Sequence, residues 1–412
     1  IPADAGTNPL WQTWIDDLRF QSLITTVDFD KDPALYSLLD GNGIDVAADN
    51  IVNYKNEYTN VPRPWVHQKC QMVFALTNLC GMPYSIDFAT GRQNFIDRAD
   101  NARFRVSPMI ENAALPVGPE IAVMYATAPT AIWTHFASFA KSTGAFPLGF
   151  PARPHTRGIT DYRYRGIESQ NKVVGQIVDG VILADGQIPP VGSYDFLTVD
   201  AGCIDNAPVE IARTYLSGVG GRNDRNADTA DRAVILIDPF ADIPTFGPRK
   251  SVPIFEVIQN LITGLVAQNR YNTRDLALAA HADVYSRFML TARRMLRCDD
   301  KEVQAVGGTA LCSARFSAFF GFFDKEYSKH DYFLGRQNCR EFLTRELAMP
   351  FEQNPLGYTK AQAKTFGHED IVNGQNVRFV PIIPVMPSLA QEDEMPTWPD
   401  PKYTFDPDTL WD

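Results

Sequence analysis

Short, mainly apolar runs along the chain predict buried strands. Such runs occupy 71–79 (QMVFALTNL), 195–202 (DFLTVDAG) and 232–239 (RAVILIDP). The last run is apolar enough to lie in a sheet that is covered on both faces. The segment 172–186 (KVVGQIVDGVILADG) predicts further strands around a turn.

Other segments repeat their apolar residues every three or four positions, which predicts helices. The first begins near Asn8, a good N-cap residue that is followed by Pro9 at the first helical position. The segment 119–140 also has helical spacing, interrupted at Pro129. From Ile254 the spacing is helical again, and it continues through 273–296 (TRDLALAAHADVYSRFMLTARRML).

Strands separated by helices, followed by mainly helical sequence, are typical of an α/β sheet domain with a helical addition. We therefore expect an α/β domain over 1–250 and a mainly helical C-terminal region over 251–382. The last segment, 383–412, is a tail rich in proline and acidic residues.

The composition of the chain indicates which partners it can bind and in which cell compartment it works. The formal net charge of −11 argues against a nucleic-acid partner, which would favour a basic face. No window holds eighteen consecutive apolar residues, so no transmembrane helix is predicted. The 6 cysteines are scattered without a CxxC pair, which indicates reduced thiols and a cytoplasmic protein rather than a disulfide framework or a zinc site.

Two aspartate-rich segments, 28–32 (DFDKD) and 224–228 (DRNAD), begin like calcium-binding EF-hand loops. Such a loop needs glycine at its sixth position and glutamate at its twelfth. Pro33 and Leu39 stand there in the first case, and Thr229 and Ile235 in the second. We interpret both as ordinary polar loops, so no metal site is predicted.

One stretch is locally basic within this acidic chain. The segment 153–166 carries four arginines, Arg153, Arg157, Arg163 and Arg165. Two tyrosines, Tyr162 and Tyr164, stand directly before the last two arginines. Two interpretations remain open: contact with anionic lipid headgroups, or a solvated loop with internal ion pairs. The aromatic segment 314–323 likewise fits either an interfacial surface or a core.

Within the stretch 195–202, Asp200 follows the apolar strand 196–199 (FLTV) and is itself followed by two small residues. An acid at this position either caps the next turn or serves as a catalytic base, since ligands of α/β sheets bind outside the carboxyl ends of strands. A serine hydrolase of this class would also need a G-x-S-x-G elbow, and no serine of this chain has it. The nearest, Ser142 in AKSTG, follows a helical segment instead of a strand.

Several segments together resemble the patatin-like phospholipases, in particular their larger bacterial members. The stretch 199–208 (VDAGCIDNAP) is similar to that family's D-G-[GA] motif and its N-x-P helix start, with Ala201 where glycine is commoner. The stretch 141–151 (KSTGAFPLGFP) resembles the family's A-S-x-A-x-P-x-x-F segment, which makes Ser142 a structural element. Weaker resemblances lie at 72–88 and 321–336.

The resemblance implies a patatin-like sheet flanked by helices, and hydrolysis of lipid acyl esters by a Ser-Asp dyad without metal or organic cofactor. Asp200 falls on the catalytic aspartate, whereas substrate-binding residues are not assigned. The family's glycine-rich oxyanion loop and its serine would precede Ile1, so we expect this chain to be part of a longer protein.

Several partners follow from this expectation. They are an acyl-ester substrate, a membrane surface that the protein contacts transiently, and a cleaved N-terminal companion chain or a second copy of the chain. The alternative is a non-catalytic module, a pseudoenzyme or lipid-binding scaffold that never had the serine.

Overall fold

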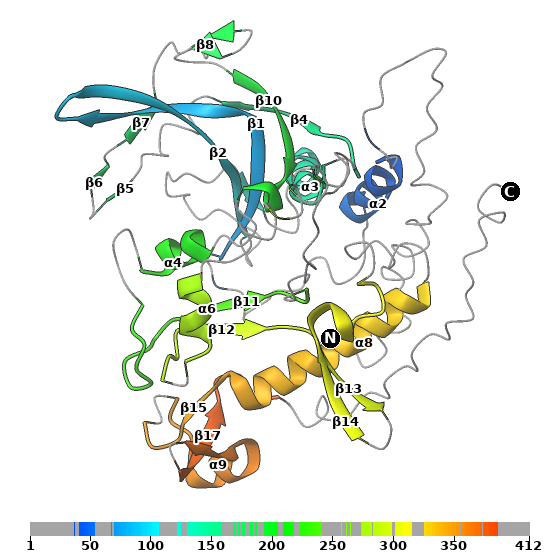
Figure 1. Ribbon diagram of the computed structural model, residues 1–412, viewed down its shortest axis with the longest axis vertical. Helices are drawn as coiled ribbons and strands as arrows, with labels where there is room; N and C mark the ends of the chain where they lie inside the picture. The colour runs from blue at the N-terminus through cyan, green and yellow to red at the C-terminus, as the bar shows by residue number, and fades with distance from the viewer. Residues whose placement is uncertain are drawn as a thin grey trace, which may run out of the picture. The chain divides into compact units, whose positions relative to one another are not determined.

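The computed structural model divides the chain into two compact units (Figure 1). The N-terminal unit comprises 9–208 and 251–270, and the C-terminal unit comprises 1–8, 209–250 and 271–412. The residues described by the structure are 37, 41–53, 67, 70–106, 122–124, 130–147, 149–158, 168–169, 172–173, 175–177, 182–183, 186–187, 193–204, 209–217, 223–240, 257, 261, 264, 273–281, 283–298, 301–314, 325–353, 356–372 and 374–385.

The main sheet of the N-terminal unit has the strand order β3-β2-β1-β10-β4, with β7 paired to β1. The strands are β1 (Cys70–Phe88), β2 (Gly91–Val106), β3 (Ala122–Met124), β4 (Arg153–Gly158), β7 (Gly175–Ile177) and β10 (Ser193–Asp200). Every pairing is antiparallel except that of β2 with β3. Two small antiparallel sheets join β5 (Glu168–Ser169) to β6 (Lys172–Val173), and β8 (Ile182–Leu183) to β9 (Gly186–Gln187).

The long hairpin of β1 and β2 dominates this sheet (Figure 1). Its register shifts between Thr77 and Met82, where the Oδ1 of Asn78 accepts hydrogen bonds from the backbone N–H groups of Cys80 and Gly81. Gly81 has a φ of +76°, and a Cβ there would come within 2.4 Å of the Ile96 side chain. A glycine is therefore required in this bulge, because other residues rarely adopt that φ.

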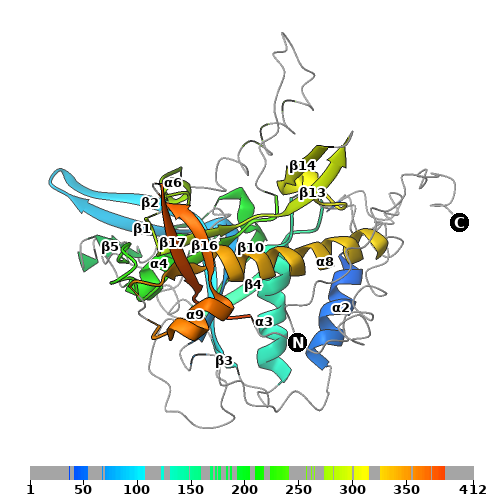
Figure 2. The same ribbon diagram turned by 90° about the horizontal axis from the view of Figure 1, so that it is seen from below.

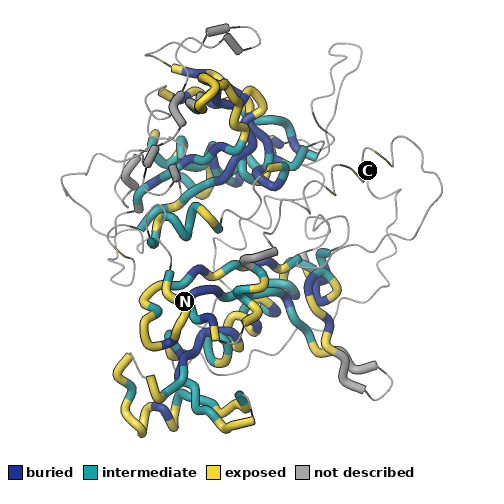
Figure 3. Tube along the Cα trace, turned by 60° about the vertical axis from the view of Figure 1, so that its left-hand side comes forward, coloured by how far each residue is buried: buried dark blue, intermediate teal, exposed yellow. Residues whose placement is uncertain are grey.

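Helix α3 (Thr130–Thr143) packs on the sheet, and α2 (Asn42–Asn53) packs against α3 (Figure 2). Four buried residues form the core between α3 and the sheet: Leu76, Ala102, Phe104 and Phe139. The ring of Phe104 meets that of Phe136 nearly edge-on, with centroids 5.1 Å apart. The centre of the sheet is thus buried, whereas residues 88–98 at the far end of the hairpin are exposed (Figure 3).

The C-terminal unit combines short sheets with helices. Its elements are α4 (Val209–Ser217), β11 (Val234–Ile237), α6 (Thr273–Ala279), β12 (Arg287–Leu290), β13 (Arg293–Cys298), β14 (Lys301–Val306), the 3-10 turn η5 (Gly307–Ala310), α8 (Lys325–Glu341), the π-helical turn η6 (Phe342–Glu346), β15 (Ala348–Pro350), α9 (Lys360–Phe366), β16 (His368–Val372) and β17 (Gln375–Pro381). β11 and β12 pair in parallel, β13 and β14 form a hairpin, and β17 lies between β15 and β16.

The predicted strands at 71–79, 195–202 and 232–239 are confirmed as β1, β10 and β11, and the fold is mixed α/β. β11, however, is not covered on both faces, since Ile235 and Ile237 are 40% and 68% exposed. The predicted strands within 172–186 are confirmed as short pieces.

Two helix predictions were partly wrong. Before Pro129, 122–124 form β3, which pairs with β2, and the helix begins only at Thr130. In 273–296 the helix ends at Ala279, because the aromatic and apolar residues that follow pair as β12 with β11. Among the described residues of 251–382, six strands accompany the helices, and the mainly helical character expected of this region stays a prediction.

The N-terminal helix near Asn8 lies outside the described residues, as does 386–412 of the expected tail. The described residues of 254–265, which are Val257, Leu261 and Gly264, are helical.

Replacing Phe104 by alanine tests the core of the N-terminal unit, where this side chain is fully buried. We expect Phe104→Ala to lower the free energy of unfolding by about 3–5 kcal/mol, because the lost ring leaves a cavity. Phe88→Ala is the matched control: Phe88 is 49% exposed, and surface substitutions usually change stability by about 0.5 kcal/mol or less. Urea unfolding followed by circular dichroism measures both, and equal losses would contradict this core.

Candidate functional site

Asp200 is the last residue of β10, an inner strand whose neighbours are β1 and β4. Leu76 of β1 lies directly opposite Asp200. The backbone N–H of Asp200 donates a hydrogen bond to the carbonyl of Ala145, at 2.9 Å, in the loop after α3. β10 is antiparallel to both neighbours, so the rule that ligands bind at the carboxyl ends of parallel strands does not apply to Asp200.

The Asp200 carboxylate caps the turn that follows it. Its Oδ1 accepts a hydrogen bond of 2.6 Å from the backbone N–H of Gly202, the second residue of the 3-10 turn η4 (Ala201–Cys203). Burial raises the pKa of this carboxyl above its ordinary value, and the Gly202 hydrogen bond opposes that rise only in part. Within the described ranges, no cation pairs with Asp200 and its Oδ2 receives no hydrogen bond. The capping interpretation is confirmed, and the catalytic one stays a proposal.

The loop after α3 brings the stretch 141–151 against Asp200. α3 ends at Thr143, whose Oγ1 donates to the carbonyl of Ala75 in β1 at 2.7 Å. Two residues later Ala145 is 1% exposed and accepts the Asp200 N–H. The two stretches that carry the resemblance in the sequence are therefore in direct contact.

Ser142 is fully buried beneath this loop. Its hydroxyl donates to the carbonyl of Ser138 at 2.9 Å and lies 2.6 Å from the Nε2 of His155, on β4. Because the hydroxyl has one proton, His155 must be the donor of that second hydrogen bond. The His155 ring also stacks on Phe139, with centroids 4.2 Å apart. These contacts agree with a structural role for Ser142 and with its exclusion as the nucleophile.

His155 is held in its neutral form. Burial lowers its pKa to about 4, and the positive charges of neighbouring His135 and Arg157 act in the same direction. At neutral pH the imidazole is therefore uncharged, and its role is to donate to Ser142.

The basic segment 153–166 makes internal ion pairs where the structure describes it. Arg153 and Lys141 both bind the Asp45 carboxylate, at 2.8 and 2.6 Å. Burial alone would raise the pKa of Asp45, but the hydrogen bonds from Lys141 and Arg153 outweigh it and lower that pKa. Arg157 is also paired, as described next, whereas Arg163 and Arg165 lie outside the described residues. For Arg153 and Arg157, the structure therefore agrees with internal ion pairs, the second of the two interpretations of this segment.

A buried polar row under the same face of the sheet was not predicted from the sequence. Arg157 binds Asp100 at 3.0 Å, and the two side chains are only 3% and 2% exposed. Asn78 donates to the other oxygen of Asp100, and the Tyr194 hydroxyl donates to the carbonyl of Gly81. These residues lie far apart in the sequence and meet only through the register of the strands. No local sequence motif could therefore have predicted them.

The comparisons with known proteins leave the family open. No family model and no solved structure matches the chain. The chain is similar to the uncharacterized protein y4iI of Sinorhizobium fredii, with 28% identity over 364 residues. The match covers 82% of this chain and 51% of that protein, so the chain spans about half the length of the curated relative it matches. Among the described residues, no helix is long and apolar enough to cross a membrane.

Acid should destabilise the protein through His155. The unfolded imidazole takes up a proton near pH 6.5, but the folded one only near pH 4, so stability is lost as the pH falls from 6.5 to 4. We expect His155→Gln, which keeps a donor for Ser142 and does not titrate, to lose less stability over this window. Urea midpoints between pH 7 and pH 4 measure it, and an unchanged pH profile would contradict a buried neutral His155.

Asp200→Asn should raise the melting temperature at pH 7. A folded-state pKa above 3.8 means that the ionised Asp200 carboxylate costs stability at neutral pH, whereas asparagine still offers an oxygen to the Gly202 N–H. The advantage should shrink as the pH falls through the raised pKa toward 3.8, because the wild-type carboxyl becomes neutral.

Asp195→Asn is the control for this measurement. Asp195 is exposed on the same strand and accepts a hydrogen bond from Thr156 Oγ1, which asparagine can also accept. Its melting temperature should not change, and an Asp200→Asn protein that melts below the wild type at pH 7 would contradict the electrostatics described above.

Proposed function

We propose that the protein is a lipid acyl hydrolase of the patatin-like kind, in which Asp200 is the base of a Ser-Asp dyad. The serine would come from a segment outside this sequence. The observation that carries the proposal is the state of Asp200: a largely buried carboxyl with a raised pKa, one oxygen held by the Gly202 N–H.

This arrangement suits proton transfer. The Gly202 N–H holds Oδ1 and orients the carboxylate, and Oδ2 offers lone pairs to a serine hydroxyl. As the serine oxygen attacks the ester carbonyl, its proton would pass to Oδ2 without an intervening histidine. The protonated Asp200 would then give this proton to the departing alcohol as the acyl-serine ester forms. In the second half-reaction the carboxylate would take a proton from the attacking water and return it to the serine oxygen as that ester is cleaved. A raised pKa makes Asp200 a stronger base than an ordinary carboxylate.

Three further observations support the proposal. Ala201 and Gly202 are buried, which agrees with small residues directly after Asp200. The loop 144–150 contacts Asp200 through Ala145. The chain also spans about half the length of its curated relative, which leaves room for a serine in a longer protein. The reaction as written uses no metal or organic cofactor.

The proposed partners follow from this chemistry. The substrate is a lipid or other acyl ester, the protein contacts membrane surfaces transiently from the cytoplasm, and the serine arrives on a cleaved companion chain, in a longer polypeptide or in a second copy. The competing proposal is a non-catalytic module. It is favoured by the Gly202 hydrogen bond, because turn capping alone accounts for an aspartate at position 200.

The test compares Asp200→Asn with Asp195→Asn in the full-length product of the genomic reading frame. We expect Asp200→Asn to lower kcat/KM for p-nitrophenyl esters and phospholipid vesicles by roughly 10²–10⁴-fold, the usual contribution of a general base. The pH profile of the remaining activity should no longer contain the ionisation step that Asp200 gives in the wild type. Asp195→Asn, an exposed change on the same strand, should keep wild-type rates.

Two outcomes would overturn the catalytic proposal. One is a full-length protein that hydrolyses no ester and does not react with a fluorophosphonate serine probe, which favours the non-catalytic module. The other is ester turnover that survives Asp200→Asn, which removes Asp200 from the chemistry.

A further inference from the structure

Three side chains of different chemistry meet in the C-terminal unit: Cys312, His330 and Asp331. One potential ligand atom of each, the thiol sulfur, an imidazole nitrogen and a carboxylate oxygen, lies within 4.8 Å of the other two. Cys312 is 7% exposed and His330 is fully buried. Sulfur, nitrogen and oxygen ligands at this spacing suit Zn²⁺, which prefers four ligands in a tetrahedral arrangement.

We propose that Cys312, His330 and Asp331 form a Zn²⁺ site with water as the fourth ligand. The proposal does not depend on Asp200 or on the lipid hydrolase activity.

Asp331 is the centre of the arrangement and holds the other groups in place. Its Oδ1 accepts from the Cys312 N–H and contacts His330 Nδ1, both at 2.9 Å. Its Oδ2 accepts from the N–H and the hydroxyl of Ser313. Metal binding would exchange one of these four hydrogen bonds for a metal–oxygen bond, and the other three would keep the carboxylate oriented.

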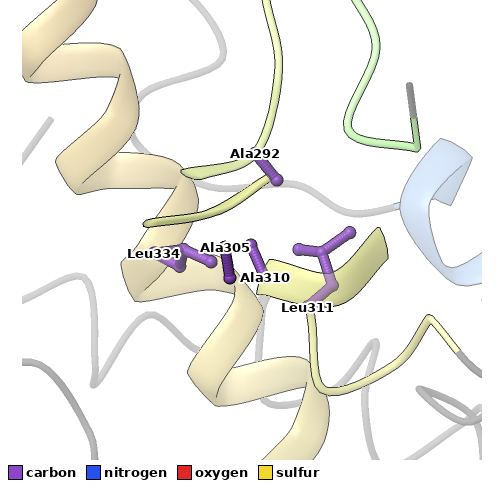
Figure 4. Packing of buried hydrophobic residues seen from close by; sticks show 5 residues of the cluster. All are labelled: Ala292, Ala305, Ala310, Leu311 and Leu334. Atoms are coloured by element: carbon purple, nitrogen blue, oxygen red, sulfur yellow. The ribbon is translucent and has the colours of Figure 1, made fainter. Parts of the chain in front are cut away.

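The site stands on rigid elements. His330 and Asp331 lie on α8, and Cys312 follows η5 by two residues. One turn after His330, Leu334 packs with Ala292, Ala305, Ala310 and Leu311 (Figure 4). The neighbour of Cys312, Leu311, thus belongs to the same core as the helix that carries the other two ligands. Ligands fixed by packing need little rearrangement to bind an ion.

The charges of the site also fit a cation. Burial would raise the pKa of Asp331, but the hydrogen bonds from His330, Ser313 and the loop backbone outweigh it, so the carboxylate stays ionised. Burial and the Asp331 charge raise the pKa of Cys312 to about 12. Without an ion the thiol therefore keeps its proton, and Zn²⁺ binding would release that proton to solvent as the metal–sulfur bond forms.

Arg294 is the opposing charge, and it interacts with both Cys312 and Asp331. It favours the thiolate form of Cys312, which is the form that binds a metal, but it also repels a cation. The net affinity is therefore expected to be below that of a Cys₄ site.

The sequence does not reveal this group, because its cysteine has no CxxC partner. His330 and Asp331 are adjacent in the chain, and Cys312 lies on the far side of the aromatic segment 314–323. Only the packing of η5 on α8 brings the three ligands together.

The test uses the purified chain, stripped of metal with a chelator and titrated with Co²⁺. Thiolate ligation of Co²⁺ gives an intense near-ultraviolet charge-transfer band, and we expect this band to saturate at one Co²⁺ per chain and to disappear when Zn²⁺ is added. Cys312→Ser should abolish the band. Asp331→Asn should weaken Co²⁺ affinity by roughly 10–100-fold or more.

Cys339→Ser is the matched control, because Cys339 is an exposed cysteine on the same helix. It should retain the band and the stoichiometry. If Cys312→Ser does not fold, the wild-type titration still shows whether the chain binds Co²⁺ through a thiolate. A wild-type chain without the band, a band that survives Cys312→Ser in a folded protein, or a band lost in Cys339→Ser would each overturn the proposal.

Discussion

The hydrogen bond from the Asp200 N–H to the Ala145 carbonyl ties the main sheet of the N-terminal unit to the loop after α3. It joins the last residue of β10 to the loop in which α3 ends. Leu76 opposite Asp200 belongs to the core that α3 covers, so sheet, helix and loop meet at one residue. The backbone N–H of Asp200 is fixed by Ala145, and its partly buried carboxyl is fixed by the Gly202 N–H.

The polar row under α3 limits how the sheet can form. Asp100 and Arg157 come from strands far apart in sequence, and each is buried with its charge. An unpaired buried charge costs several kcal/mol, on the order of 3–5. Any register that separated Asp100 from Arg157 would leave both charges without compensation. The pair therefore favours the observed register over alternatives that bury the same apolar residues, a role for which buried ion pairs are retained in some proteins.

The sequence predicts some features of this molecule well and others poorly, for physical reasons. Mainly apolar runs located β1, β10 and β11, although burial accounts for only part of each run, since Leu197, Ile235 and Ile237 are exposed. The end of β10 at Asp200 was also predictable, since small residues must follow where the backbone turns. The helix prediction for 273–296 was wrong beyond Ala279. The spacing of that segment fits a helix, but Arg287–Leu290 pair as a strand with Val234–Ile237, 53 residues earlier. The buried polar row and the Cys312 cluster could not be predicted, because their members meet only through tertiary packing.

The bulge in β1 keeps Tyr84 beside Phe95. Between the pairs Thr77↔Ala99 and Met82↔Asp97, β1 advances five residues while β2 advances two. On β2, Phe95 is an odd number of residues from Asp100, the partner of Leu76, so Phe95 projects from the opposite side of the ribbon to Leu76. In a regular strand Tyr84, eight residues after Leu76, would project from the side of Leu76 and α3. The bulge reverses the alternation in β1 alone, and this reversal allows the ring of Tyr84 to stack on that of Phe95.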